Sequence, residues 1–379
     1  MKIVIAPQSF KGALTGKMAA KAIEQGVWSV YPKATTLLMP IADGGDGTLD
    51  VLHDNGIIDL FSSTVIGPMN QPTTAKWGVM SDGTTAVIEL AQASGLTLVP
   101  HQKRNPRTAT SKGTGELFRT VLDRGYRKVI VFLGGSATND AGAGLLHALG
   151  VRLLDKDGQE ISSGGIHLIK LETIDVTRLD PRLKETDIVV ATDVSNPLLG
   201  PNGATAIYGP QKGASPSVVK ELEAALTHFS KIVRRDLGRD IAECPGAGAA
   251  GGVGGALLAF TNSRIQSGID LICDALHVDE HFRNTNLVIT GEGRIDQSTI
   301  FNKAPVGLAR RAKTFGIPVI ALAGSLGSGY RDVYSHGIDA VCCILDRPLS
   351  FRESVDQTYE LLSAATERAL RLFKTSATS

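Results

Sequence analysis

Residues 3–12 read IVIAPQSFKG, a short unbroken apolar run followed by a polar loop with a lysine and a glycine. After this loop, apolar residues from Met18 to Val27 recur at helical spacing, and Pro32 marks the end of the pattern. A second unit follows, with a strand predicted at 36–41, the loop ADGGDG at 42–47 and a helix from Thr48. Strands that alternate with helices in this way indicate a parallel sheet.

The end of the chain repeats this alternation. An apolar run at 287–290 precedes the loop GEGRID at 291–296, and apolar runs at 318–323 and 340–345 alternate with helical patterns at 305–315 and 353–373. Residues 63–99 instead show the turns and short strands of an antiparallel sheet. We therefore predict a two-domain α/β protein. Residues 1–62 plus 286–379 form a doubly wound, Rossmann- or flavodoxin-like domain, and residues 63–285 form a mixed α/β domain inserted into it.

The composition excludes several classes of protein. A formal net charge of +1 provides no broad basic field that would attract nucleic acid or a membrane surface. No apolar stretch is long enough to span a bilayer, and the N-terminus enters a strand without a signal peptide. The four cysteines form no CxxC pair, as expected of buried free thiols. We therefore expect a cytoplasmic protein that binds small molecules.

One glycine-rich loop is suited to bind phosphate. Residues 134–140 read GGSATND and lie between an apolar run at 129–133 and a helix predicted at 141–149. Consecutive backbone N–H groups and hydroxyls at the start of a helix form an anion site. The loop is not a Walker A motif, because no lysine followed by serine or threonine completes that pattern.

A second glycine-rich loop carries carboxylates. Asp43 and Asp46 belong to the segment DGGDG at 43–47, directly after a predicted strand. Hydrated Mg²⁺ takes one or two carboxylates together with phosphate oxygens, so this loop is a candidate metal site. A tight turn whose aspartates cap the next helix is the competing interpretation, and both stay open.

Charged residues follow further predicted strands, where open α/β sheets bind their ligands. Asp193 follows the apolar run at 188–191, and the loop at 291–296 contains two acids and an arginine. Lys11 follows the first strand, Arg104 lies in the basic segment KRNPR at 103–107, and Lys212 lies in GPQKG at 209–213. Such cations are suited to clamp phosphate or carboxylate groups.

The run GAGAAGGVGG at 246–255 contains a formal GxGxxG match. A dinucleotide site needs this motif directly after a strand, and the preceding residues are Glu243, Cys244 and Pro245. Close approach of a nucleotide and close packing of a helix both stay open as interpretations.

Six segments occur together and in order: IVIAPQSFKG (3–12), ADGGDGT (42–48), KRNP (103–106), GGSAT (134–138), GPQKG (209–213) and GEGRID (291–296). With them the chain closely resembles the bacterial type I glycerate kinases, which act in glucarate and glyoxylate utilisation. The resemblance runs from residue 1 to the last predicted helix. It implies two α/β domains with a cleft between them, and transfer of the γ-phosphoryl group of ATP to D-glycerate, giving 2-phosphoglycerate.

The chain departs from the family at one position. The family pattern reads Ala-Pro-Asp-Ser-Phe-Lys, and this sequence has Gln8 where the aspartate would stand. Glutamine cannot act as a base and is a poor ligand for Mg²⁺. The chemical role of the first loop therefore rests mainly on Lys11 and on the resemblance.

Phosphoryl transfer needs positioning and charge neutralisation more than covalent chemistry. We predict that ATP is bound by Gly134, Gly135, Ser136, Thr138, Gly291 and Glu292. We predict that D-glycerate is bound by Ser9, Arg104 and Lys212. Mg²⁺ is held by Asp43 and Asp46 or by Asp193, and Lys11 or Arg294 stabilises the transferring group. Asp193 is the first choice for orienting or deprotonating the attacking hydroxyl, and Asp296 is the second.

Three alternatives remain open from the sequence. The 3-hydroxyl of glycerate could be the attacking group instead, and the product would then be 3-phosphoglycerate. The glycine run at 246–255 could belong to a dinucleotide-binding oxidoreductase. The protein could also bind a sugar acid without turning over ATP. A homodimer is compatible with the sequence.

Overall fold

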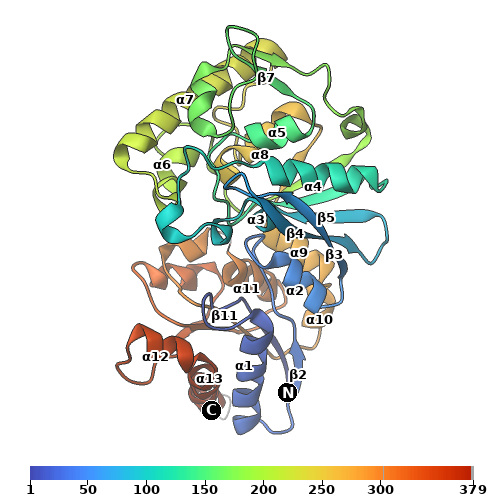
Figure 1. The fold of residues 1–379 in the computed structure, drawn as a ribbon. Coiled ribbons are helices and arrows are strands. Elements are labelled where there is room, and N and C mark those ends of the chain that lie inside the picture. Colours follow the sequence, from blue (N-terminus) through green and yellow to red (C-terminus); the bar gives the residue numbers. More distant parts are fainter. Residues whose placement is uncertain (302, 377–379) are drawn as a thin grey trace. The chain divides into compact units, whose positions relative to one another are not determined.

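The computed structural model describes residues 1–301 and 303–376, and the chain forms two compact units (Figure 1). The terminal unit comprises Met1–Asp43, Asp50–Ile57 and the residues from Ile269 onward. The inserted unit comprises Gly44–Leu49 and Ile58–Gly268. Each unit has its own sheet and its own hydrophobic core.

The sheet of the terminal unit is parallel throughout, with its described strands in the order β13-β12-β11-β1-β2. Its strands are β1 (Lys2–Pro7), β2 (Thr35–Leu38), β11 (Leu287–Glu292), β12 (Val319–Ala323) and β13 (Ala340–Cys343). Counted within this unit, the order is the flavodoxin-like 2-1-3-4-5. In such sheets the ligand lies beyond the carboxyl ends of the first and third strands, which here are β1 and β11.

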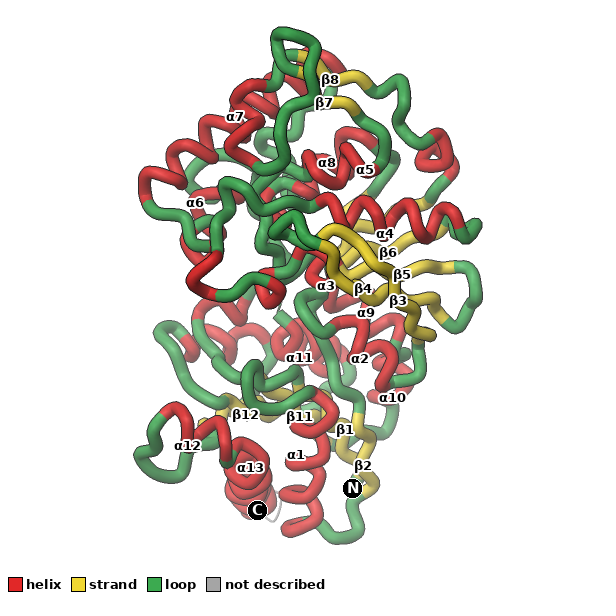
Figure 2. The backbone as a smooth tube through the Cα atoms, in the orientation of Figure 1, coloured by secondary structure: helices red, strands yellow, loops and turns green. Residues whose placement is uncertain are grey.

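Helices cover both faces of this sheet, so the prediction of a doubly wound domain is confirmed (Figure 2). On one face α1 (Gly16–Val30) packs against α13 (Thr358–Ser376), and α11 (Ala304–Thr314) lies on the other. The close approach of α1 to α13 requires Gly26, because a Cβ there would lie 2.3 Å from the carbonyl oxygen of Ser363. The other helices that lie wholly or partly in this unit are α2 (Thr48–Asp54), α9 (Gly268–Ala275), α10 (Val278–Phe282) and α12 (Phe351–Asp356).

The sheet of the inserted unit is mixed and has the order β10-β9-β6-β5-β4-β3. Its strands are β3 (Ile58–Ile66), β4 (Pro72–Met80), β5 (Thr85–Glu89), β6 (Lys128–Phe132), β9 (Asp187–Ala191) and β10 (Arg264–Gln266). A separate hairpin joins β7 (Arg152–Leu154) to β8 (Thr173–Asp175). The antiparallel pairing predicted from residues 63–99 joins β3, β4 and β5, but β5 also pairs with β6 in the parallel sense.

Helices of the inserted unit pack on this sheet around a core that contains the fully buried side chains of Trp77, Phe118 and Phe229. These helices are α3 (Leu90–Ser94), α4 (Lys112–Asp123), α5 (Ala143–Ala148), α6 (Ala204–Tyr208), α7 (Pro216–Leu237) and α8 (Val253–Phe260). In the described part of the chain, every helix is too short or too polar to cross a membrane.

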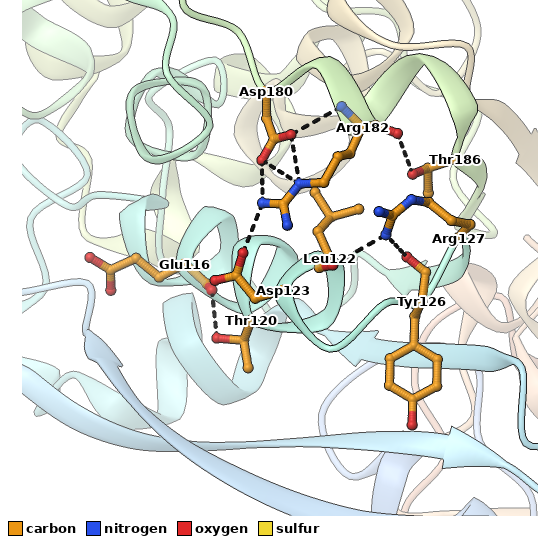
Figure 3. Close-up of polar contacts among 9 residues, drawn as sticks. All are labelled: Glu116, Thr120, Leu122, Asp123, Tyr126, Arg127, Asp180, Arg182 and Thr186. Atoms are coloured by element: carbon orange, nitrogen blue, oxygen red, sulfur yellow. Dashed lines mark hydrogen bonds and ion pairs between the residues drawn. The ribbon is translucent and has the colours of Figure 1, made fainter.

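Ion pairs fasten the end of α4 at the amino edge of this sheet (Figure 3). Arg182 lies between two carboxylates, with Nη2 2.8 Å from Asp123 Oδ1 and 2.7 Å from Asp180 Oδ2. Asp123 ends α4, which leads into β6, and Arg182 precedes β9. In the same helix, Glu116 accepts the backbone N–H of Ile66 at 2.6 Å. The ion pairs of Arg182 therefore secure the scaffold from the edge opposite to the predicted ligand loops, whereas the bond of Glu116 fixes the end of β3 on the ligand side.

The unit boundaries differ from the predicted divisions at 62/63 and 285/286. Ile58 already begins β3, which pairs along its whole length with β4. Residues 269–285 belong to the terminal unit, because the ring of Phe282 packs edge-on against Phe315, with the centroids 5.8 Å apart. A Cβ added to Gly307 of α11 would lie 2.7 Å from the side chain of Ile269. Such packing between residues far apart in the chain cannot be predicted from local sequence patterns.

Candidate active site

The parallel strands β5, β6, β9 and β10 of the inserted unit end together at one edge of the sheet. Glu89, Phe132, Ala191 and Gln266 form a row of neighbours across this edge. The loop at 134–138 begins just beyond β6. This edge is where α/β sheets place their ligands.

The two glycine-rich loops predicted from the sequence meet at this edge. The N–H of Gly134 donates to the carbonyl oxygen of Gly44 at 3.0 Å. A Cβ on Gly134 would lie 2.4 Å from Cα of Gly45, so only glycine permits this backbone contact. On the next residue, the Cβ position of Gly135 lies 3.4 Å from Cβ of Asp46. The phosphate-type loop and the second aspartate of DGGDG are therefore neighbours.

Glu89 is a buried acid at this edge that the sequence reasoning missed. Its Oε1 accepts the N–H of Gly47 at 3.1 Å, and its Oε2 accepts the N–H of Leu49 at 2.9 Å. Burial raises the pKa of Glu89 to about 7, the hydrogen bonds oppose this shift, and the charge of Asp46 adds to it. The one available sign was a glutamate that ends the apolar run at 86–88.

The loop at 134–138 presents unused backbone donors. Within the described residues, the N–H groups of Gly135, Ser136 and Thr138 have no protein acceptor. Gly135 has a φ of 75°, a left-handed conformation that lets successive N–H groups turn toward one point. Such a group of donors can bind an anion without any charged side chain of its own.

Lys212 supplies a positive charge to the same loop. Its ammonium donates to Ser136 Oγ at 2.8 Å and to the carbonyl oxygen of Thr138 at 2.6 Å, and the residue is only 2% exposed. Burial lowers the pKa of Lys212 to about 7, and the negative charge of Asp140 opposes that shift. The structure therefore places this predicted substrate-binding lysine on the predicted phosphate loop.

A pocket of ≈ 210 Å³ opens beside Lys212. Its polar wall carries Lys103, Arg104 and Asn105 together with Lys212, and Ala137 of the loop forms another part of the wall. Three cationic side chains around a small volume attract an anionic ligand.

Arg104 is incompletely satisfied in this pocket. Its Nη1 donates to the carbonyl oxygen of Gln211 at 3.4 Å. Its Nε is buried and has no hydrogen-bond partner among the described residues. An unmade hydrogen bond of a buried charged group costs about 1–3 kcal/mol or more, and an anionic ligand would remove that cost.

The glycine run at 246–255 braces the phosphate-type loop from behind. A Cβ on Gly251 would lie 2.1 Å from the carbonyl oxygen of Thr138, and Thr138 Oγ1 donates to the carbonyl oxygen of Ala250 at 3.3 Å. In the described structure no strand precedes the run, which forms a short turn and then α8. Gly248, Gly251 and Gly254 are explained by close contact with backbone carbonyl oxygens, and the missing strand removes the support for a dinucleotide-binding oxidoreductase.

Asp140 braces the loop from its other end. This fully buried carboxylate accepts the backbone N–H and the hydroxyl of Ser111 at 2.9 and 2.8 Å, and the N–H of Gly142 at 3.1 Å. Because Ser111 lies at the start of α4, these bonds attach the loop to that helix.

Asp193 lies just beyond β9 at the same edge. Its Oδ1 accepts the hydroxyl of Ser267 at 2.8 Å, and Ser267 follows β10. Asp193 is half-buried, and it follows β9, which is the direct neighbour of β6. The strand β6 leads into the loop at 134–138, called the anion loop below. Its position is compatible with contact to a ligand at this edge.

In the terminal unit, the loops after β1 and β11 lie next to each other. The Cβ position of Gly293 is 3.6 Å from the backbone nitrogen of Lys11 and 3.7 Å from Cα of Phe10. Lys11 is exposed, Ser9 is half-buried, and Gln8 is buried. These loops occupy the position beyond β1 and β11 where a flavodoxin-like sheet binds its ligand.

Two charged residues of the loop after β11 are engaged with one another. Arg294 Nε lies 3.1 Å from Asp296 Oδ2, and Asp296 also caps the short helical turn at 297–300 by accepting from Ser298. Burial alone would raise the pKa of Asp296, but Ser298 and the charges of Lys303 and Arg294 lower it below its ordinary value. A carboxylate of low pKa is a weak base, which makes Asp296 poorly suited to that role.

Glu292 ends β11 and is buried. The strand is two residues longer than predicted, because Gly291 and Glu292 pair with Leu322 and Ala323 of β12. A Cβ on Gly291 would lie 2.3 Å from the carbonyl oxygen of Leu322, which explains this glycine by strand packing. Burial raises the pKa of Glu292 to about 7, although the charge of Lys303 opposes this. Glu292 thus reaches the ligand edge at the central strand of its sheet.

The carboxylates fit a magnesium ion that is held mainly by a nucleotide. Among the residues that the structure describes, no three His, Cys, Asp or Glu side chains are grouped to hold a metal ion. Mg²⁺ does not need such a cage, since it commonly takes one or two carboxylates plus phosphate oxygens and water. Asp46, whose Cβ lies beside Gly135 of the anion loop, is one carboxylate suited to this donor set.

These features define an α/β protein whose sheet edges are built to handle small anionic ligands. A family model described as the glycerate kinase family matches residues 3–374. The chain is 47% identical over 363 residues to a glycerate kinase from Halalkalibacterium halodurans, covering 96% of each chain. It is 46% identical over 366 residues to a glycerate 2-kinase from Escherichia coli K12, covering 97% of this chain and 96% of the relative.

A solved structure has the same fold. The crystal structure of a protein from Salmonella typhimurium LT2, provisionally named glycerate kinase 2, superposes with a TM-score of 0.83 at 42% identity and covers 100% of both chains. The chain therefore belongs to the glycerate kinase family, and the resemblance seen in its motifs is confirmed.

Proposed function

We propose that this protein is an ATP-dependent glycerate kinase that phosphorylates the 2-hydroxyl of D-glycerate. The observation that carries the proposal is the cationic pocket of the inserted unit, because Lys212 lines this pocket and also donates hydrogen bonds to Ser136 and Thr138 of the anion loop at 134–138. An acceptor pocket and a phosphate loop that share one cation suit phosphoryl transfer to a small acid. The names of the relatives, among them a glycerate 2-kinase, support the choice of acid and hydroxyl.

The size of the pocket supports a three-carbon acid. A volume of ≈ 210 Å³ is sufficient for a molecule of seven non-hydrogen atoms such as glycerate. A nucleoside triphosphate is several times larger. We therefore assign the pocket to the acceptor, with Arg104 and Lys212 facing the carboxylate.

The phosphates of ATP are assigned to the donors of Gly135, Ser136 and Thr138, and to Asp46 through Mg²⁺. Mg²⁺, when bound, neutralises the negative charge of the nucleotide phosphates. Asp43 stays the second predicted ligand. Asp193 stays the first choice for orienting or deprotonating the attacking hydroxyl, since the low pKa of Asp296 disfavours that residue.

In the terminal unit, Lys11 and Arg294 stay the predicted cations for the transferring group, Glu292 stays a predicted ATP-binding residue, and Ser9 a predicted glycerate-binding one. Arg294 already neutralises Asp296 at 3.1 Å, which leaves Lys11 as the more available charge. A cytoplasmic location and a homodimer also stay predictions from the sequence.

Two measurements test the proposal. Phosphorus NMR of the product made from D-glycerate and Mg·ATP is expected to show a 2-phosphomonoester; a 3-phosphomonoester would establish the other regiochemistry. A coupled assay is expected to detect ADP only when both substrates are present. Binding of glycerate without ADP release would instead favour a sugar-acid binding protein, and stabilisation by NAD but not ATP would favour an oxidoreductase.

A further inference from the structure

The DGGDG loop is held by a residue outside it. Three of its five residues are glycines, and Gly44 and Gly47 adopt positive φ values of 80° and 91°. Glycine loses more conformational freedom on ordering than any other residue, so holding this loop in one conformation costs much conformational entropy. Its fixed shape therefore depends on partners elsewhere in the inserted unit.

Glu89 is the side chain that fixes the end of the DGGDG loop. Both of its carboxylate oxygens are used on the segment, one by the N–H of Gly47 and one by the N–H of Leu49. These N–H groups lie at the start of α2, where a helix leaves its first donors without an internal partner. A side chain of the loop usually caps such a helix, but Gly47 has none and the hydroxyl of Thr48 donates to the carbonyl oxygen of Gly45.

Glu89 is fully buried, so its carboxylate depends on the hydrogen bonds that it accepts. The residue is 0% exposed, and a third bond from Gln92 Nε2 at 3.3 Å reaches Oε1. Burying a carboxylate is costly unless hydrogen bonds compensate for it. Here the compensation comes mainly from the backbone of the loop, so carboxylate and loop stabilise each other.

Asp46 lies directly before the N–H that Glu89 holds. On its other side, the loop is fixed by the bond from Gly134 to Gly44. The Cβ of Asp46 is thereby kept beside Gly135 of the anion loop. The exposed carboxylate itself is free to take a ligand, while its backbone is clamped at both ends.

We propose that Glu89 is a positioning residue that holds Asp46 beside the anion loop, ready for the cation of a metal–nucleotide complex. The assignment to a metal rests on the proposed phosphoryl transfer. Loss of the clamp is expected to weaken metal binding and to leave the acceptor pocket intact, because none of the residues that line the pocket belongs to this segment.

The test compares Glu89→Gln with a matched control, Glu116→Gln. Glu116 also accepts a backbone N–H, but its partner Ile66 ends β3 and does not belong to the DGGDG segment. Hydrogen exchange of the full-length protein without ligands measures how firmly the loop backbone is held. Mn²⁺ binding in the presence of ADP, followed by electron paramagnetic resonance, measures the affinity of the metal site. Kinetics add the half-saturating Mg²⁺ concentration and the KM for D-glycerate.

In Glu89→Gln, exchange at Gly47 and Leu49 is expected to accelerate by about tenfold or more, because a hydrogen bond to a charged acceptor is lost. The Mn²⁺ dissociation constant and the half-saturating Mg²⁺ concentration are expected to rise by a similar factor, with the glycerate KM within about twofold. Glu116→Gln is expected to accelerate exchange only near Ile66. Glu89→Asp, which keeps the charge but is shorter by one methylene, covers the case in which Glu89→Gln does not fold.

Unchanged exchange at Gly47 and Leu49, or unchanged Mn²⁺ affinity in a folded Glu89 variant, would overturn the inference. A parallel loss in both Glu89→Gln and Glu116→Gln would also overturn it, since that pattern reports general destabilisation. A wild-type protein that releases no ADP would contradict the proposed function instead, and exchange and Mn²⁺ binding would still decide the role of Glu89.

Discussion

The ammonium of Lys212 lies 2.8 Å from the hydroxyl oxygen of Ser136, inside the wall of the cationic pocket. Because Ser136 accepts this hydrogen bond, its own O–H proton is left to donate elsewhere, and no protein acceptor receives it among the described residues. The lysine thus both charges the loop and orients one of its donors. Removal of Lys212 should affect the acceptor and the phosphate loop together.

Lys212→Met is expected to lower kcat/KM for D-glycerate by about 10²–10³-fold. The substitution keeps the volume of the side chain but removes two charged hydrogen bonds, each worth about 1.5–3 kcal/mol. Lys103→Met is the matched control, because Lys103 lines the same pocket but is exposed. We expect less than about a tenfold loss there, as for a screened surface charge. Both variants are compared by steady-state kinetics. Similar losses in kcat/KM would mean that Lys212 contributes no more to binding than the exposed Lys103.

Binding of D-glycerate is expected to weaken as pH rises above about 7. Burial lowers the pKa of Lys212 to about 7, so the empty site holds an ammonium below that pH and a neutral amine above it. Above pH 7, an anion must bind together with a proton, and its affinity falls by up to about tenfold per pH unit. Glycerate itself is ionised throughout this range.

Calorimetric titrations of the wild-type protein between pH 6 and 9 check this dependence. Lys212→Arg is the control, since a guanidinium stays charged over the whole range and its profile should be flat. A wild-type affinity that does not change between pH 6 and 9 would show that Lys212 is not the titrating group.

The terminal unit could be predicted closely, because its strands are covered by helices on both faces. Such strands give continuous apolar runs, as in residues 3–6 and 287–290, and the loops after them follow directly. The inserted unit was harder to predict. β5 pairs with β4 in the antiparallel sense and with β6 in the parallel sense, so residues 85–89 have no single pattern.

Most of the predicted loops were identified by their composition, but the residues that hold them were not. Glu89 acts on Gly47 and Leu49, about forty positions earlier in the chain, and no local spacing connects them. The glycines near Gly251 have the composition of a nucleotide motif, although their cause is contact with the backbone of Thr138. In both cases the explanation is a distant backbone neighbour, which a single sequence does not record.

Gly134→Ala is expected to destabilise the protein by about 1–3 kcal/mol, the usual cost of overpacking. Its Cβ would lie 2.4 Å from Cα of Gly45 and 2.7 Å from the carbonyl oxygen of Gly44, and backbone atoms cannot move aside as a flexible side chain can. Because the two loops would separate, kcat should fall as well. Gly255→Ala in α8 is the control, with its nearest contact at 3.3 Å, and should cost less than about 1 kcal/mol. Thermal denaturation and steady-state kinetics of both variants test this prediction. Equal losses of stability in the two variants would mean that the contact between Gly134 and the 44–45 backbone is unimportant.

Asp193→Asn is expected to lower kcat by about 10²–10⁴-fold if this carboxylate takes the proton of the attacking hydroxyl. Its hydrogen bond from Ser267 orients the carboxylate, so Ser267→Ala should cause a smaller loss in kcat without abolishing turnover. Asp187→Asn is the control: Asp187 starts the same strand, β9, but is exposed and pairs with Arg264 at the opposite edge. Steady-state kinetics at saturating Mg·ATP separate the outcomes. A kcat for Asp193→Asn within about tenfold of wild type, equivalent to about 1.4 kcal/mol, would exclude the base role, and Asp193 would then serve at most to position the substrate.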